Sequence, residues 1–170
     1  AQSPITAVVL SADGKEVIVG TERGDVLAYT LATPVAQRSL ANYGKAVRGL
    51  AASTDGSSIL ASGDDRKLHS LDPKTGEQRG VVDFDAELTA VALSANNAAI
   101  AVGLAKGGVV TLDAKTLAQT ASLMGHTGLV SGLSFNTTGT QLVSSSTDGS
   151  TRLWDLATGS LAQHFSGHEG

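Results

Sequence analysis

The chain has 170 residues, of which 41% are hydrophobic and 16% charged, a balance that excludes a disordered chain and is sufficient for a hydrophobic core. The formal net charge is −4, and lysine and arginine are too scattered to form a nucleic-acid-binding face. Cysteine is absent, which excludes disulfides and thiolate metal sites. No apolar run approaches the roughly 20 residues of a membrane-spanning helix. We therefore expect neither nucleic acid nor a membrane as a partner, and composition leaves a cytoplasmic or a periplasmic location open.

Four segments of the chain repeat one pattern of alternating apolar residues followed by a turn. They begin at Ile5, Val47, Leu88 and Val130, so that successive starts lie 42, 41 and 42 residues apart. A steady period of this length is typical of the four-stranded blade of a β-propeller.

The first repeat illustrates the strands that we expect in each unit. Its strands are predicted at Ile5–Leu10, Glu16–Gly20, Asp25–Leu31 and Val35–Leu40. The turn at Asp13-Gly14 suits a hairpin, because glycine adopts the positive φ that such turns demand. No competing helical period extends over a useful length.

The turns of the later repeats fall at the same place. They are Asp55-Gly56, Asn96-Asn97 and Thr138-Gly139. We predict an all-β fold, a β-propeller of four-stranded antiparallel blades, in one domain spanning residues 1–170. The blades are expected at about 1–42, 43–84, 85–126 and 127–170.

The fourth repeat carries a more specific motif, consisting of Gly125-His126, Ser144, Asp148-Gly149 and Trp154-Asp155. In this motif the chain resembles the WD-repeat β-propeller family. The resemblance implies that His126, Ser144, Asp148 and Trp154 form a hydrogen-bonded structural tetrad.

The other three repeats depart from this motif at the tetrad positions. The resemblance therefore covers the whole chain by period, but its full motif covers only the last quarter. The residues at the four positions are Ala1, Val19, Arg23 and Tyr29 in the first repeat, Tyr43, Ala61, Asp65 and Leu71 in the second, and Phe84, Val102, Lys106 and Leu112 in the third.

Two chemical interpretations of the polar residues are rejected. Ser144, His126 and Asp148 match the residue types of a catalytic triad, but they fall at tetrad positions and no nucleophile elbow accompanies them. The four histidines, which include His69 and His164, have no metal-ligand spacing. We expect no enzymatic activity, no metal and no cofactor.

A surface for a partner protein is the better functional hypothesis. In the family that the chain resembles, the loops before the first strand of each blade and the turns between its second and third strands share one face. Arg48 stands out, since the other repeats have threonine or serine at its position. The candidate binding residues are Arg48, Arg23, Asp64, Arg66, Lys106 and Thr147.

Three functions remain open at this point. The first is a protein-interaction scaffold, the second a propeller domain of an exported redox or cytochrome-linked enzyme, and the third a self-assembling half-propeller. Four blades are few for a closed ring, since such rings of the family usually have seven or eight. The chain could be part of a longer propeller, associate with a second copy into eight blades, or close alone.

Overall fold

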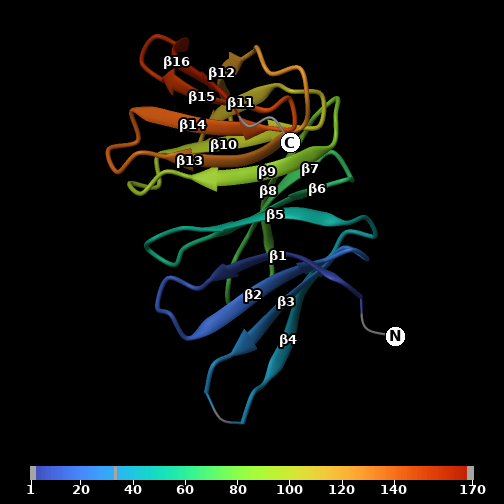
Figure 1. Cartoon of the computed structure of the whole chain (residues 1–170). Helices are drawn as coiled ribbons and strands as arrows, with labels where there is room; N and C mark the ends of the chain where they lie inside the picture. Colours follow the sequence, from blue (N-terminus) through green and yellow to red (C-terminus); the bar gives the residue numbers. More distant parts are fainter. Residues whose placement is uncertain (1–2, 33, 168–170) are drawn as a thin grey trace. The chain divides into compact units, whose positions relative to one another are not determined.

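The computed structural model describes residues 3–32 and 34–167, and all the regular structure in this part of the chain is β. Sixteen strands form four separate four-stranded sheets, each built from strands that follow one another along the chain (Figure 1). Neighbouring strands pair antiparallel. Each sheet corresponds to one sequence repeat, so the predicted fold class is confirmed. We call the sheets blades 1 to 4.

Two compact units divide the chain, Ala1–Leu88 (unit 1) and Thr89–Gly170 (unit 2). Blade 1 consists of β1 (Ile5–Leu10), β2 (Glu16–Thr21), β3 (Asp25–Thr30) and β4 (Gln37–Asn42). Blade 2 consists of β5 (Val47–Ala52), β6 (Ile59–Gly63), β7 (Lys67–Leu71) and β8 (Gln78–Asp83). Blade 3 consists of β9 (Leu88–Leu93), β10 (Ala99–Leu104), β11 (Val109–Asp113) and β12 (Gln119–Leu123). Blade 4 consists of β13 (Val130–Phe135), β14 (Gln141–Ser146), β15 (Ser150–Asp155) and β16 (Ser160–Ser166).

The last strand of blade 1 begins later than the sequence suggested. It starts at Gln37 rather than Val35, because the amide of Ala36 bonds to the Thr30 hydroxyl and the Ala36 carbonyl accepts from the Thr30 amide. These bonds close a loop after β3. β2 also extends one residue further, to Thr21.

The turn between the first two strands has the same backbone form in every blade. Gly14, Gly56 and Gly139 have φ of 67°, 69° and 72°, and Asn97 takes this place in blade 3 with φ 55°. Glycine and asparagine are the residues that tolerate this left-handed conformation best. The turn residues predicted from the sequence are thus confirmed.

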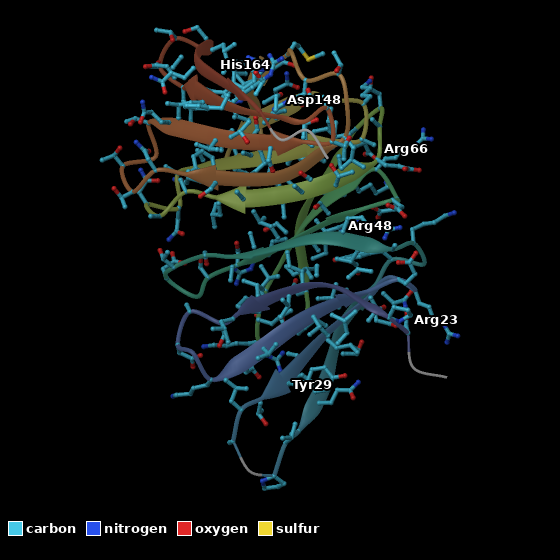
Figure 2. All side chains as sticks on the ribbon, in the orientation of Figure 1. Arg23, Tyr29, Arg48, Arg66, Asp148 and His164 are labelled. Atoms are coloured by element: carbon cyan, nitrogen blue, oxygen red, sulfur yellow. The ribbon has the colours of Figure 1, made fainter. Side chains whose placement is uncertain are left out.

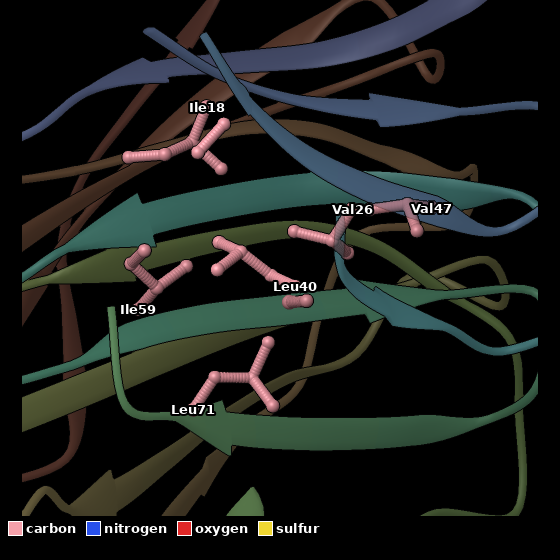
Figure 3. Close-up of a cluster of buried hydrophobic side chains, with 8 residues drawn as sticks. Ile18, Val26, Leu40, Val47, Ile59 and Leu71 are labelled. Atoms are coloured by element: carbon pink, nitrogen blue, oxygen red, sulfur yellow. The ribbon is translucent and has the colours of Figure 1, made fainter. Parts of the chain in front are cut away.

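The core of unit 1 lies between the facing sides of blades 1 and 2. Branched aliphatic side chains from both sheets meet there, each almost inaccessible to solvent (Figure 3). The labelled members of this cluster are Ile18, Val26, Leu40, Val47, Ile59 and Leu71. Unit 2 has an equivalent cluster in which Leu123 of blade 3 packs with Leu142 and Trp154 of blade 4. Apolar burial of this kind is the main stabilising contribution in each unit.

A hydrogen bond repeats at the joint between paired blades. Thr6 of β1 donates its hydroxyl to the carbonyl of Val47, the first residue of β5. In unit 2, Thr89 Oγ1 donates in the same way to the carbonyl of Val130, at 2.6 Å. The second residue of one blade's first strand is therefore tied to the start of the next blade.

Glycine allows the blades to approach closely beside this joint. A Cβ atom added at Gly20 would lie 2.5 Å from a methyl carbon of Val47, and one added at Gly103 would lie 2.7 Å from a methyl carbon of Val130. Both positions therefore require a residue without a side chain if the packing is to stay as it is.

Candidate functional site

Blade 4 brings the four predicted tetrad residues together. His126 comes from the loop before β13, Ser144 from β14, Asp148 from the turn between β14 and β15, and Trp154 from β15. His126 Nδ1 lies 2.9 Å from Asp148 Oδ2, and its Nε2 lies 2.8 Å from Ser144 Oγ. Trp154 donates its indole N–H to the same Ser144 Oγ, also at 2.8 Å. One continuous set of hydrogen bonds thus links the loop, two strands and a turn.

The direction of these bonds follows from the donors available. The Trp154 indole can only donate, so Ser144 Oγ accepts from it and directs its own hydrogen to His126 Nε2. His126 then carries its proton on Nδ1, facing Asp148. Ser144 is fully buried, so its hydroxyl is out of reach of a substrate. The arrangement is suited to holding the blade together and offers no accessible nucleophile.

Asp148 is the charged end of the tetrad. Burial raises the pKa of this carboxyl, but hydrogen bonds from the Ser150 hydroxyl, the Thr127 amide and His126 outweigh burial and hold the pKa well below its ordinary value of 3.8. Asp148 therefore remains ionised wherever the blade is folded, except in strong acid.

Blade 2 builds a different polar cluster that the sequence did not reveal. His69 of β7 places Nε2 2.7 Å from Asp65 Oδ2 and Nδ1 3.0 Å from Gln78 Oε1. Its ring stacks on Tyr43, with centroids 3.7 Å apart and planes 12° from parallel. We call Tyr43, Asp65, His69 and Gln78 the blade-2 cluster.

Compared with the tetrad of blade 4, the blade-2 cluster has its carboxylate at the same position and its imidazole at a different one. Asp65 stands at the position of Asp148, whereas Tyr43 occupies the position of His126. The imidazole instead comes from β7, on the same face as Leu71. The sequence did contain a usable signal for this cluster. Asp65 stands four residues before His69, and His69 stands two residues before Leu71, which places His69 and Leu71 on the same face of the strand.

Two features of the blade-2 cluster differ chemically from the tetrad. Both ring nitrogens of His69 face oxygen atoms, so either the ring carries two protons or the Gln78 amide turns to present its NH₂ group. The Tyr43 hydroxyl is buried and has no hydrogen-bond partner in the part of the chain that the structure describes. Burial, and secondly the nearby charge of Asp65, raise the pKa of Tyr43.

Blades 1 and 3 lack the Ser–Trp half of the tetrad, because aliphatic residues stand at the serine position of the second strand in both blades. Val102 and Leu112 are buried aliphatic residues in blade 3, and Val19 and Tyr29 lie on one face of blade 1. The first-repeat position at Ala1 lies outside the described residues.

Four of the candidate partner-binding residues belong to unit 1. Figure 2 shows Arg23, Arg48 and Arg66 along one end of blades 1 and 2. Arg48 makes two hydrogen bonds to Asp64, at 2.9 and 2.7 Å, and two longer ones to Glu22, at 3.1 and 3.3 Å. The hydrogen bond to Asp64 raises the pKa of Arg48. Arg48 is therefore held by two carboxylates, and a partner would have to compete with them.

Arg66 is the more available cation of this end. Its side chain is exposed and makes no hydrogen bond or ion pair with any residue that the structure describes. The remaining candidates, Lys106 and Thr147, are exposed turn residues of unit 2, and the amide of Thr147 bonds to the carbonyl of Leu129.

Two absences can be stated for residues 3–32 and 34–167. No group of three or more metal-ligating side chains comes together there. The same residues include no helix long and apolar enough to span a membrane.

The chain consists of four-stranded antiparallel sheets that follow one another along the sequence, and a His–Ser–Asp–Trp tetrad links the strands of one of them. These features define a β-propeller repeat protein. Residues 117–155 match the family described as "WD domain, G-beta repeat". This matching segment covers most of blade 4 but not its last strand, so the blade with the complete tetrad is the part of the chain that resembles the WD-repeat family.

Two curated relatives are similar along almost the whole chain. U3 small nucleolar RNA-associated protein 21 of Saccharomyces cerevisiae is 24% identical over 155 residues, which are 91% of this chain and 16% of that protein. The U3 small nucleolar RNA-associated protein 21 homolog of Schizosaccharomyces pombe is 25% identical over 165 residues, 95% of this chain and 18% of that protein. The chain thus spans less than a fifth of the length of these relatives. The amino-acid composition led us to expect no nucleic-acid partner. Because both relatives are named for an association with RNA, that expectation is not supported.

Proposed function

We propose that the chain is a non-enzymatic protein-interaction scaffold, and that a partner protein binds the end of unit 1 formed by Glu22, Arg48, Asp64 and Arg66. The match of residues 117–155 to the WD-repeat family supports the scaffold role. The single observation that carries the location is the exposed guanidinium of Arg66, which has no partner within the described chain.

The backbone at Arg66 supports this assignment. Its φ is 64°, in the left-handed region that costs a non-glycine residue about 1 kcal/mol. The Arg66 amide bonds to Gly63 and its carbonyl accepts from the amide of Phe84, so the turn is held in place. Such locally costly conformations concentrate at functional positions. The turn presents one cation rigidly, and an acidic side chain of the partner is its natural counterpart.

The neighbouring charges add specificity to this end. Arg48 donates hydrogen bonds to two carboxylates from different blades. Glu22 lies in the turn between β2 and β3, and Asp64 follows β6. A preorganised ion cluster of this kind favours partners with a matching charge pattern more than it adds affinity. The side chain of Arg48 is 35% exposed, so it remains within reach of a docked surface.

The names of the relatives indicate a setting for the partner. Because they are RNA-associated proteins, we propose a protein component of an RNA-containing assembly. The same names favour direct RNA contact as a second candidate. Carboxylates pair with Arg48 at this end, and the net charge is −4, which makes a protein the better fit.

Affinity capture with a charge-reversed variant tests the location. Immobilised wild-type chain, Arg66→Glu and the control Lys74→Glu are exposed to extract from the cells that carry the protein, and retained proteins are quantified by mass spectrometry. Lys74 is an exposed cation of the same blade but follows β7, whereas Arg66 precedes it. A true partner loses about tenfold or more in recovery with Arg66→Glu and is retained by Lys74→Glu.

Two outcomes count against the proposal. Equal recovery of every protein with all three chains would remove Arg66 from the binding surface. Binding of labelled RNA to the purified chain, weakened by salt and by Arg66→Glu, would replace the protein partner with RNA.

A further inference from the structure

Blade 1 has an apolar face that no other described part of unit 1 covers. Val8, Val19 and Leu27 lie opposite one another in the strand register and so share this face, which is the side turned away from the core of unit 1. The Val8 side chain is 65% exposed. A hollow of about 370 Å³ on this face is lined by the apolar side chains of Ile5, Val19 and Leu27 and by Tyr29, with the polar residues Ser3, Thr21, Asp25 and Gln37 completing its wall. We call this surface the blade-1 face.

Blade 4 has the opposite kind of apolar face. Val143 pairs with Leu153, and Phe165 pairs with Thr151, on the side of the sheet away from Trp154 and the core of unit 2. Phe165 is 53% exposed and Val143 is 38% exposed. We call this surface the blade-4 face. It presents an exposed aromatic side chain, whereas the blade-1 face presents a hollow.

The two units each contain a joint that shows how such faces fit. In unit 1, Leu40 of the fourth strand of blade 1 packs in one cluster with Leu71 of the third strand of blade 2. In unit 2, Leu123 and Trp154 make the corresponding pair. In the repeat, Phe165 of blade 4 stands at the position of Leu40 and Leu123, and Tyr29 of blade 1 stands at the position of Leu71 and Trp154. If blade 4 packed against blade 1 in the same way, Phe165 and Tyr29 would be the corresponding pair.

We propose that a second copy of this chain docks its blade-4 face on the blade-1 face, with Phe165 inserted beside Tyr29. Neither strand row that contains Val8 or Val143 has a charged residue, so the centre of the joint would be a contact between apolar side chains. Asp25, which also lines the hollow, accepts hydrogen bonds from Thr21 and Asn42 of its own blade. Exposed apolar patches of this kind mark interaction sites.

The proposed joint also has a donor for the hydrogen bond that the joints within the units contain. Thr6 and Thr89 donate to the carbonyl that begins the next blade. Ser131 occupies the same place in blade 4, and among the described residues its hydroxyl hydrogen-bonds only with the Ser145 hydroxyl, at 3.1 Å. At the joint it would donate to the carbonyl of Ile5 in the second copy.

One residue makes the proposed joint weaker than those within the units. Ser145 stands where blades 1 and 3 have Gly20 and Gly103, the positions at which an added Cβ would clash with the next blade. Ile5 of the second copy must therefore sit slightly further away. The association is expected to be reversible, and Ser145→Gly is expected to strengthen it.

Light scattering and sedimentation over roughly 1 to 100 µM chain test the proposal. The wild-type mass rises with concentration from 17.1 kDa toward twice that value. Val8→Lys and Phe165→Ser each remain at 17.1 kDa, and Ser145→Gly associates about tenfold more tightly. Val35→Lys is the control, because Val35 is an equally exposed valine in the loop after β3. Circular dichroism verifies that each variant is folded.

Mixing the two monomeric variants gives the sharpest result. The Val8→Lys chain keeps its blade-4 face, and the Phe165→Ser chain keeps its blade-1 face, so their mixture regains one intact joint and associates. Wild-type chain that stays at 17.1 kDa throughout would overturn the proposal. So would a Val8→Lys chain that still associates, or a mixture that does not.

Discussion

Blade 2 and blade 4 solve the same structural problem with different residues. Each ties the turn between its second and third strands to the sheet through a carboxylate and an imidazole, Asp65 with His69 and Asp148 with His126. The carboxylate keeps its place in the repeat, while the imidazole comes from a strand in one blade and from a loop in the other. These two blades therefore share the position of the carboxylate and differ in the element that supplies the ring, whereas blades 1 and 3 have Arg23 and Lys106 at the carboxylate position.

The two clusters differ in how completely their polar groups are matched. In blade 4, Ser144 lies between the His126 ring and the Trp154 indole, and each of these groups has a partner. In the blade-2 cluster the hydroxyl of Tyr43 is buried without a partner among the described residues. Unmatched buried groups cost free energy, so we expect the blade-4 tetrad to contribute more to stability than the blade-2 cluster.

The largest expected effect is at the indole of the tetrad. Trp154→Ala leaves a cavity in the core of unit 2 and removes the donor to Ser144, and should lower the free energy of unfolding by about 3–5 kcal/mol. Trp154→Phe, which keeps most of the volume, should cost clearly less. Urea unfolding followed by circular dichroism measures both. An alanine variant as stable as wild type would remove the tetrad account.

A somewhat smaller effect is expected at the imidazole of blade 2. His69→Ala removes the ring stacked on Tyr43 and leaves Asp65 without its buried partner, which should cost about 2–3 kcal/mol. The exposed histidine His164 is the matched control, and His164→Ala should change stability by less than about 0.5 kcal/mol. Equal losses for the two variants would mean that the blade-2 cluster is incidental.

The carboxylate of the tetrad gives a pH-dependent prediction. Asp148→Asn should cost about 1–3 kcal/mol at neutral pH, because the ionised acceptor is lost. Since the pKa of Asp148 is lowered in the folded chain, its stabilisation is present above the ordinary value of 3.8 and is lost as pH falls toward the lower folded value. Urea midpoints between neutral pH and strong acid should therefore converge for wild type and variant. Curves that stay parallel in acid would contradict the assigned hydrogen bonds.

The smallest effect is expected at the buried Tyr43 hydroxyl of the blade-2 cluster. Tyr43→Phe keeps the ring stacked on His69 and removes a buried hydroxyl that has no partner. It should leave stability unchanged or raise it by up to about 1 kcal/mol. A loss above that amount in urea unfolding would show that the hydroxyl is matched in solution.

Period and turn chemistry were enough to predict the strands of all four blades. Residues such as Gly14 and Asn97 mark a backbone conformation that few side chains adopt, so local sequence specifies these turns. The start of β4 was missed because it depends on a bond between the Thr30 hydroxyl and the Ala36 amide, which leaves no pattern in the sequence.

Side-chain partners were harder to predict than backbone. The tetrad residues were selected because the motif places all four at once. The blade-2 cluster was missed because its histidine lies at a position where the motif has none, and only the fold shows that β7 directs His69 toward Asp65. Likewise, Arg48 looked like a free anchor in sequence, and the fold gives it two carboxylates from separate turns.

A double-mutant cycle in each blade tests most directly whether the two clusters are equivalent. The free energies of unfolding are measured for Asp65→Ala, His69→Ala and the double variant, and likewise for Asp148→Ala, His126→Ala and their double variant. Residues within one hydrogen-bond network show coupling of about 0.5–3 kcal/mol, and we predict such coupling in both blades, larger in blade 4. Coupling in blade 4 together with strictly additive effects in blade 2 would contradict the account, because Asp65 and His69 would then not act as a pair.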